Sequence, residues 1–165
     1  MRNGKTASSH LAGNEKLTTS CIMGTMLDFI GVKIALINRG EILMIQRDDK
    51  PGLRYAGLWD FPGGGREGDE TPMECILREI HEELGITLES DQIVWKKVFP
   101  AMHDKNFKAY FMVAEISENE INDIVFGDEG QGWKMFSIDE FFSSNKVVEP
   151  LKDRLQSYFD TKVQV

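Results

Sequence analysis

The feature that most constrains this chain is a run of three glycines followed by a capped, acidic segment, GGGREGDETPMECILREIHEELGI, at positions 63–86. Thr71 suits the N-cap of a helix, Pro72 the first helical position, and Gly85 the left-handed residue beyond the C-terminus. Glu74 follows Thr71 at the spacing of a capping box. The sequence therefore predicts a helix that begins after Thr71 and ends before Gly85.

The predicted helix has one apolar face and one acidic face. The apolar residues recur at i, i+3, i+4 and i+7, which predicts a single stripe facing the core: Met73, Ile76, Leu77, Ile80 and Leu84. On a separate arc, Glu79, Glu82 and Glu83 are spaced i, i+3 and i+4, where each like-charge pair costs about 0.2–0.5 kcal/mol. The basic residues nearby, Arg78 and Arg66, are expected to give little relief.

Two interpretations fit this acidic face, a solvated surface or a site for a divalent cation. The glycines favour the cation site, because they let the backbone turn sharply and expose a carbonyl or an amide beside the carboxylates. They do not form a P-loop, since no GxxxxGK[ST] is present. Mg²⁺ takes carboxylate oxygens together with substrate phosphate oxygens. The segment therefore predicts phosphate binding through a metal ion.

The net charge of −8 argues against a nucleic-acid polymer as partner, because a phosphate backbone requires a basic surface. It leaves room for a small phosphorylated ligand, since a bound metal inverts the local charge. Cys21 and Cys75 lack CxxC spacing, which indicates neither a disulfide framework nor a zinc site and favours the cytoplasm. No run of 18 apolar residues occurs, so no membrane span is expected. No feature indicates an oligomeric state.

Residues 1–25 are polar and without periodicity, which predicts a disordered leader before a single domain at 26–165. Within the domain, 29–47 predict a β-hairpin, and further strands are expected at 58–61, 93–99, 107–116 and 133–136. A capping box of Ser137 and Glu140 opens a short helix. A last amphipathic helix at 149–159 has one apolar face, made of Leu151, Leu155, Tyr158 and Phe159. The order of elements predicts an α/β fold with a mixed sheet.

The acidic segment resembles the Nudix box of the Nudix hydrolases, and it matches every fixed position of that motif: Gly64-x5-Glu70-x7-Arg78-Glu79-Ile80-x-Glu82-Glu83-x-Gly85-Ile86. The resemblance implies an α/β/α sandwich around a mixed sheet, with the box forming loop–helix–loop. It also implies hydrolysis of nucleoside diphosphates linked to another group, with Mg²⁺ or Mn²⁺ as cofactor.

Carried over by position, the resemblance implies a role for each matching residue. Glu79, Glu82 and Glu83 would be metal ligands, and one of them would help to deprotonate the attacking water. Gly63 would offer its carbonyl to the metal. The residues that would orient the loop and the glutamates are Glu70 and Arg78.

Two further stretches, QRDDKPGLRYAGLWDFPGGG and GDEGQGW, resemble the MutT-type branch, which converts nucleoside triphosphates such as 8-oxo-dGTP to a monophosphate and pyrophosphate. This resemblance implies that Glu129 is a metal ligand or the general base, with a solvated acidic turn as the alternative. Arg47 would lie near the phosphates, unless it forms a surface ion pair. Trp59, Asp60 and Phe61 would border a base pocket, unless the two aromatic residues belong to the core.

Three functions remain open for a small-molecule nucleotide partner. The leading one is a (d)NTP pyrophosphohydrolase. The second is a hydrolase of ADP-ribose, another nucleotide sugar or a dinucleoside polyphosphate. The third is a Nudix-fold ligand-binding module without catalysis, which loss of the glutamates would favour, whereas all of them are present.

Overall fold

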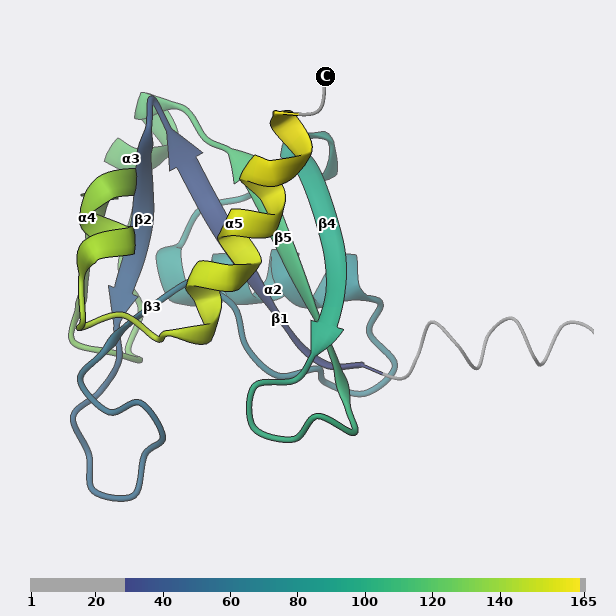
Figure 1. The fold of residues 1–165 in the computed structure, drawn as a ribbon. Helices are drawn as coiled ribbons and strands as arrows, with labels where there is room; N and C mark the ends of the chain where they lie inside the picture. The colour runs from purple at the N-terminus through teal and green to yellow at the C-terminus, as the bar shows by residue number, and fades with distance from the viewer. Residues whose placement is uncertain (1–28, 164–165) are drawn as a thin grey trace, which may run out of the picture.

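The computed structural model describes residues 29–163, so the leader predicted at 1–25 lies outside the described residues. The chain contains both strands and helices, mixed along its length (Figure 1). Their bounds are β1 Phe29–Asn38, β2 Glu41–Gln46, β3 Trp59–Asp60, α2 Pro72–Leu84, η1 Ser90–Gln92, β4 Ile93–Pro100, β5 Lys108–Glu115, α3 Glu118–Asn122, β6 Gly132–Ser137, α4 Ile138–Ser143 and α5 Pro150–Lys162.

The strands form one mixed sheet in the order β3-β2-β1-β5-β4, with β6 also paired to β2. β1 and β5 run parallel, and the other pairs are antiparallel. The mixed sheet confirms the predicted fold class. The predicted hairpin is confirmed at its turn, where the Cα partners are Ile37 with Ile42 and Asn38 with Glu41.

The first half of β1 pairs with the glycine segment rather than with β2. The Val32 N–H donates to the Gly64 carbonyl at 2.9 Å, and the Ile34 N–H donates to the Pro62 carbonyl at 3.0 Å. An isolated antiparallel bridge joins Gly31 to Gly65. The glycine segment is therefore held along β1 before the chain enters α2.

Helices cover both faces of the sheet, and α5 lies in front of it and α2 behind it in Figure 1. The core on the α2 side includes Ile76 and Ile80 with Ile34 of β1. The core on the other side includes Leu151 of α5 with Ala35 of β1, together with Phe141 of α4. Because successive side chains of a strand point to opposite faces, β1 supplies both cores. The α/β/α sandwich is confirmed.

Local capping signals placed α2 correctly. The Thr71 hydroxyl accepts from the Glu74 N–H, the Glu74 carboxylate accepts from the Thr71 N–H, and Gly85 adopts φ 67°. Only one of the two hydrogen bonds of the capping box predicted at Ser137 is present. Its hydroxyl accepts from the Glu140 N–H, but the Glu140 carboxylate pairs instead with Lys134 at 2.8 Å.

Two short elements were missed by the sequence analysis, α3 and η1. Each is too short to show an apolar period, although Ser117 and Glu120 form a reciprocal capping box at α3. None of the helices within residues 29–163 has the length and apolar content needed to cross a bilayer.

Candidate active site

Two of the three glycines, Gly63 and Gly64, lie where a side chain would collide with its surroundings. Gly63 has φ 118°, and a Cβ there would collide with the Val32 carbonyl of β1. A Cβ at Gly64 would lie 2.5 Å from Oε1 of Glu79 on α2. The glycines therefore bring the backbone against the carboxylates of the helix, as the sequence predicted.

Glu83 is fixed by this backbone. The Gly63 N–H donates to Oε2 of Glu83 at 2.7 Å. Burial raises the pKa of Glu83 to about 7, although the nearby Lys33 ammonium and the Gly63 N–H oppose the shift. Burial also raises the pKa of Glu79 above its ordinary value. Two carboxylates that ionise reluctantly mark this end of α2 as a functional site.

Arg78 ties the loop to the helix. Its guanidinium donates to Glu70 at 3.0 Å, to Glu79 at 2.9 Å, to Glu82 at 3.0 Å and to the Gly65 carbonyl at 2.9 Å. The hydrogen bonds from Arg78 lower the pKa of Glu70 to about 2. The expectation that Arg78 gives little relief to the acidic face is therefore wrong. The contacts to Glu70 and Glu79 are those that the predicted orienting role requires.

The three glutamates predicted as metal ligands do not converge in this arrangement. The Glu82 side chain is 57% exposed and is held by Arg78, as is the Glu79 carboxylate, whereas Glu83 faces the Gly63 N–H. Among residues 29–163, no three His, Cys, Asp or Glu side chains are grouped closely enough to hold a metal ion. Arg78 contacts only Oε1 of Glu79 and Oε2 of Glu82, so each of these carboxylates keeps a second oxygen.

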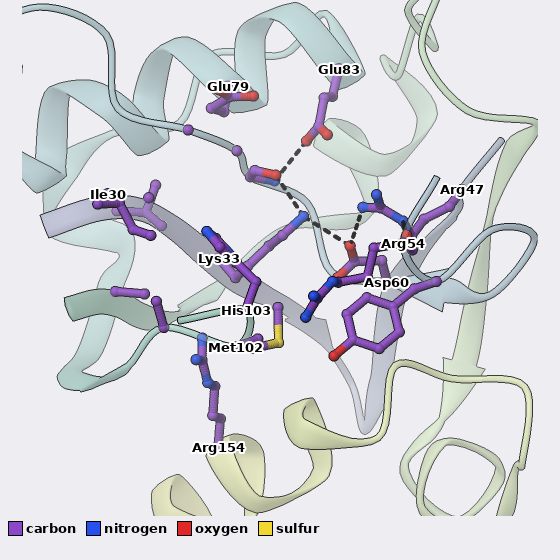
Figure 2. Close-up of a pocket in the computed structure, with 18 of the residues that line it drawn as sticks. Ile30, Lys33, Arg47, Arg54, Asp60, Glu79, Glu83, Met102, His103 and Arg154 are labelled. Atoms are coloured by element: carbon purple, nitrogen blue, oxygen red, sulfur yellow. Dashed lines mark hydrogen bonds and ion pairs between the residues drawn. The ribbon is translucent and has the colours of Figure 1, made fainter. Parts of the chain in front are cut away.

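A cavity of about 610 Å³ lies beside the glycine segment, and Figure 2 shows Glu79 and Glu83 at its α2 side. Glu129, from the loop before β6, lines the same cavity. Its neighbour Asp128 lines only an adjoining cavity of about 270 Å³, which Glu129 also borders. The structure thus brings Glu129 to the glutamates of the helix, and its role as ligand or base stays a prediction.

Lys33 occupies the centre of this site. Its ammonium lies 2.6 Å from the Gly63 carbonyl, 3.0 Å from the Phe61 carbonyl and 3.1 Å from Oδ2 of Asp60. Sequence analysis did not single out Lys33. The available signal was a lone lysine within the apolar strand FIGVKIALI, because a lysine is rarely buried without a partner.

The structure places the residues proposed from the MutT-type resemblance in different surroundings. Arg47 and Asp60 both line the cavity and pair with each other at 2.9 Å (Figure 2). The Phe61 side chain is 1% exposed, and its ring packs against Phe141 and Phe111 with centroids 5.1 and 5.5 Å apart. Phe61 does not line the larger cavity but borders the smaller one. Its ring packs in the core, and its role at a base pocket stays a prediction. It presents its backbone carbonyl to Lys33.

The donor chemistry fits a hard divalent cation. Glu79 and Glu83 supply carboxylate oxygens to the cavity, and Gly63 supplies a carbonyl oxygen. Oxygen donors of these two kinds are the ones that Mg²⁺ and Mn²⁺ prefer. The Lys33 ammonium on the Gly63 carbonyl shows that a positive charge is already stabilised at that oxygen.

Curated relatives match about a third of the chain. CTP pyrophosphohydrolase of Escherichia coli (strain K12) is 44% identical over 61 residues, which cover 36% of this chain and 44% of the relative. 8-oxo-dGTP diphosphatase of Proteus vulgaris is 44% identical over 46 residues, which cover 28% of this chain and 39% of the relative. The matches thus span less than half of either relative.

Solved structures and a family model match a larger part of the chain. A solved structure of the MutT protein from Methanosarcina mazei Go1 has a TM-score of 0.62 at 23% identity and covers 81% of this chain and 95% of that one. A bifunctional NMN adenylyltransferase/ADP ribose pyrophosphatase from Francisella tularensis gives 0.63 at 23% identity, over 81% of this chain and 42% of that one. The family model described as NUDIX domain matches residues 29–158. The chain therefore belongs to the Nudix family.

Proposed function

We propose that this chain is a metal-dependent nucleoside-triphosphate pyrophosphohydrolase that releases a monophosphate and pyrophosphate. The observation that carries the proposal is the single cavity in which two carboxylates of α2 meet the cationic side chains of Lys33 and Arg47. Bound Mg²⁺ or Mn²⁺ would neutralise phosphate charge and lower the pKa of the attacking water. The names of the matched relatives, acting on CTP and 8-oxo-dGTP, support a triphosphate substrate.

Each side chain of the cavity has a role in this proposal. Glu79 and Glu83 would hold the cation together with the Gly63 carbonyl. Glu82 would join them through the carboxylate oxygen that Arg78 does not contact. Glu83, with a pKa of about 7 before metal binds, is suited to take a proton from water at neutral pH. Glu129 is the second candidate for that proton or for the metal.

The remaining polar residues would bind or orient. Lys33 and Arg47 lie where the phosphate oxygens would enter the cavity, and Asp60 fixes both cations through one carboxylate oxygen. Arg78 and Glu70 would keep the glycine segment in place against α2. Substitution of these residues should disturb the geometry of the site rather than remove a reacting group.

We further propose a single domain at 26–165, a cytoplasmic location and a small nucleotide substrate rather than a nucleic-acid polymer. The net charge of −8 supports the small substrate. Relatives named RNA pyrophosphohydrolase, for example that of Gluconacetobacter diazotrophicus at 44% identity over 50 residues, give a specific reason to test 5′-triphosphorylated RNA beside free nucleotides.

Two alternative functions are tested by the same experiment. ADP-ribose, nucleotide sugars and dinucleoside polyphosphates share the phosphoanhydride bond, and the Francisella tularensis structure is titled as an ADP ribose pyrophosphatase complexed with AMP and a Mn ion. A binding module without catalysis is the other. The retained glutamates at positions 79, 82 and 83 favour an enzyme.

The test is a substrate panel with product identification in Mg²⁺. Pyrophosphate together with a monophosphate supports the proposal, whereas AMP with ribose 5-phosphate assigns ADP-ribose. Glu83→Gln should abolish turnover while Glu118→Gln, an exposed carboxylate paired with Arg39, should not change it. A wild-type protein that binds these compounds but turns over none of them would be the binding module.

A further inference from the structure

The wall of the cavity opposite the glutamates contains a buried cation that the proposed chemistry does not use. Arg154 of α5 is 4% exposed, yet it lines the same cavity as Glu79 and Glu83. Figure 2 shows its side chain rising from α5 toward Met102 and His103, on the far side of the cavity from α2. A group there would meet the part of a substrate that lies away from the reacting phosphates.

The contacts of Arg154 leave most of its donors available. One Nη donates to the Pro100 carbonyl at 2.9 Å, and the guanidinium lies 5.3 Å from the centre of the Phe99 ring. Within residues 29–163, no carboxylate lies at ion-pair distance from Arg154, and Asp60 attracts it only from farther away. Burial lowers the pKa of Arg154 from its usual value. A guanidinium has five N–H donors and remains charged, so an interior position without a counter-ion requires compensation.

A second feature of the same cavity is a strained aromatic residue. Tyr55, in the loop between β2 and β3, has φ 58°, which a bulky side chain rarely adopts. Tyr55 lines the cavity and lies near enough to Arg154 to influence its charge. Strain of this kind is kept where the surrounding structure and function require it. The apolar Ala101 and Met102 complete a surface suited to a flat aromatic ring.

We propose that Arg154 is the specificity-determining residue of this cavity, and that its guanidinium donates to two neighbouring acceptors on the edge of the nucleobase. The inference rests on the proposed nucleotide substrate. Guanine offers such a pair at O6 and N7, and cytosine offers one at N3 and O2. In adenine, the amino group on C6 is a donor that lies beside both of the acceptors N1 and N7. In uracil, the N3–H donor lies between the two carbonyl oxygens. The cavity should therefore prefer guanine or cytosine nucleotides over adenine and uracil nucleotides.

The oxidised base separates the two possibilities further. In 8-oxoguanine, N7 carries a hydrogen, so the acceptor pair at O6 and N7 is lost. If guanine is the base bound, dGTP should be preferred over 8-oxo-dGTP. If cytosine is the base bound, dCTP should be preferred over both. Both orders of substrate preference follow from the two parallel N–H donors of the Arg154 guanidinium.

The experiment compares the wild type with Arg154→Lys, which keeps the charge without the fork, and Arg154→Met, which keeps only the stem. Arg39→Met is the control, because the Arg39 side chain is 81% exposed and pairs with Glu118, and neither residue lines the cavity. The kcat/KM for dGTP or dCTP should exceed that for dATP and dUTP by on the order of 10- to 100-fold in the wild type and the control. Both Arg154 variants should reduce this ratio to within about threefold, mainly through KM, as expected for an interaction of equal strength in ground and transition states.

Binding of the mononucleotides GMP, CMP, AMP and UMP, measured by calorimetry, separates this inference from the proposed function. If the wild type hydrolyses no triphosphate, the proposed function fails, and mononucleotide binding still decides the base preference. The inference is supported if the wild type binds GMP or CMP more tightly than AMP and UMP, and if folded Arg154→Lys binds all four with similar affinity. Equal affinity for all four bases in the wild type, or an unchanged preference in either variant, overturns it and leaves Arg154 as a packing residue for Phe99.

Discussion

Replacing Glu83 with glutamine should stabilise the metal-free protein by an amount that depends on pH. Burial raises the pKa of Glu83 from 4.5 to about 7. Between these values the folded protein keeps a proton that the unfolded chain has released, so its stability falls as pH rises through this window. The destabilisation is complete above about pH 7. At about 1.4 kcal/mol per pH unit, it amounts to at most about 3 kcal/mol.

Glutamine has nearly the shape of a protonated glutamate and cannot ionise. Its side-chain oxygen can still accept from the Gly63 N–H, which in the wild type lies 2.7 Å from Oε2 of Glu83. The variant should therefore be about 1–3 kcal/mol more stable than the wild type at pH 8, and equal to it within about 0.5 kcal/mol at pH 4.5. Added Mg²⁺ should reduce or reverse the difference at pH 8, because the metal stabilises only a protein that binds it.

The measurement is urea unfolding of both proteins in excess EDTA at several pH values. Glu82→Gln serves as a matched control from the same turn of α2. Since the Glu82 side chain is 57% exposed, its ion pair with Arg78 should contribute about 0–1 kcal/mol. A Glu83 variant that is no more stable than the wild type at pH 8 would refute the reasoning, because the carboxylate would then not be desolvated at a net cost.

Three further substitutions, one of them with a matched control, test the site. Lys33→Met should tighten Mn²⁺ binding by at least about tenfold in an electron paramagnetic resonance titration, because the ammonium beside the glycine carbonyl repels the metal; unchanged or weaker binding would be the contrary result. Gly64→Ala should displace the Glu79 carboxylate and lower kcat by roughly 100-fold, since the added Cβ would lie 2.5 Å from Oε1 of Glu79. The control Gly65→Ala should keep most activity, because a Cβ there meets nothing closer than 3.9 Å. Glu129→Gln should lower kcat far more than it raises KM; a change in KM alone would assign it to substrate binding.

Local signals explain why α2 could be predicted from the sequence. Thr71, Pro72 and Gly85 act on their own neighbours, so the caps can be recognised without knowing the rest of the fold. The apolar period of the helix likewise predicted which face is buried, and Ile76 and Ile80 lie in the core. The mixed sheet followed from the order of the elements, whereas the pairing of β1 with the glycine segment depends on contacts between distant residues.

The polar contacts of the site depend on tertiary structure. Lys33 is 30 positions from Gly63, and Arg154 reaches the cavity from the last helix, so no spacing rule could join them to the glutamates. Arg78 was underestimated for a different reason. A helical wheel places it beside the acidic face, but it does not show that one guanidinium can contact Glu70, Glu79 and Glu82 together. The packing of the Phe61 ring against Phe141 likewise joins residues distant in the sequence, so the core alternative for Phe61 could not be chosen from the sequence.

The central claim is that Glu83 and the glycine segment form a divalent-cation site that supports hydrolysis. The most direct test is Mn²⁺ binding, followed by electron paramagnetic resonance at pH 7.5, in the wild type, Glu83→Gln and the distant control Glu118→Gln. We expect the wild type and the control to bind Mn²⁺ with the same affinity, and Glu83→Gln to bind at least about tenfold more weakly while remaining folded. Equal Mn²⁺ affinity in all three proteins would contradict the claim.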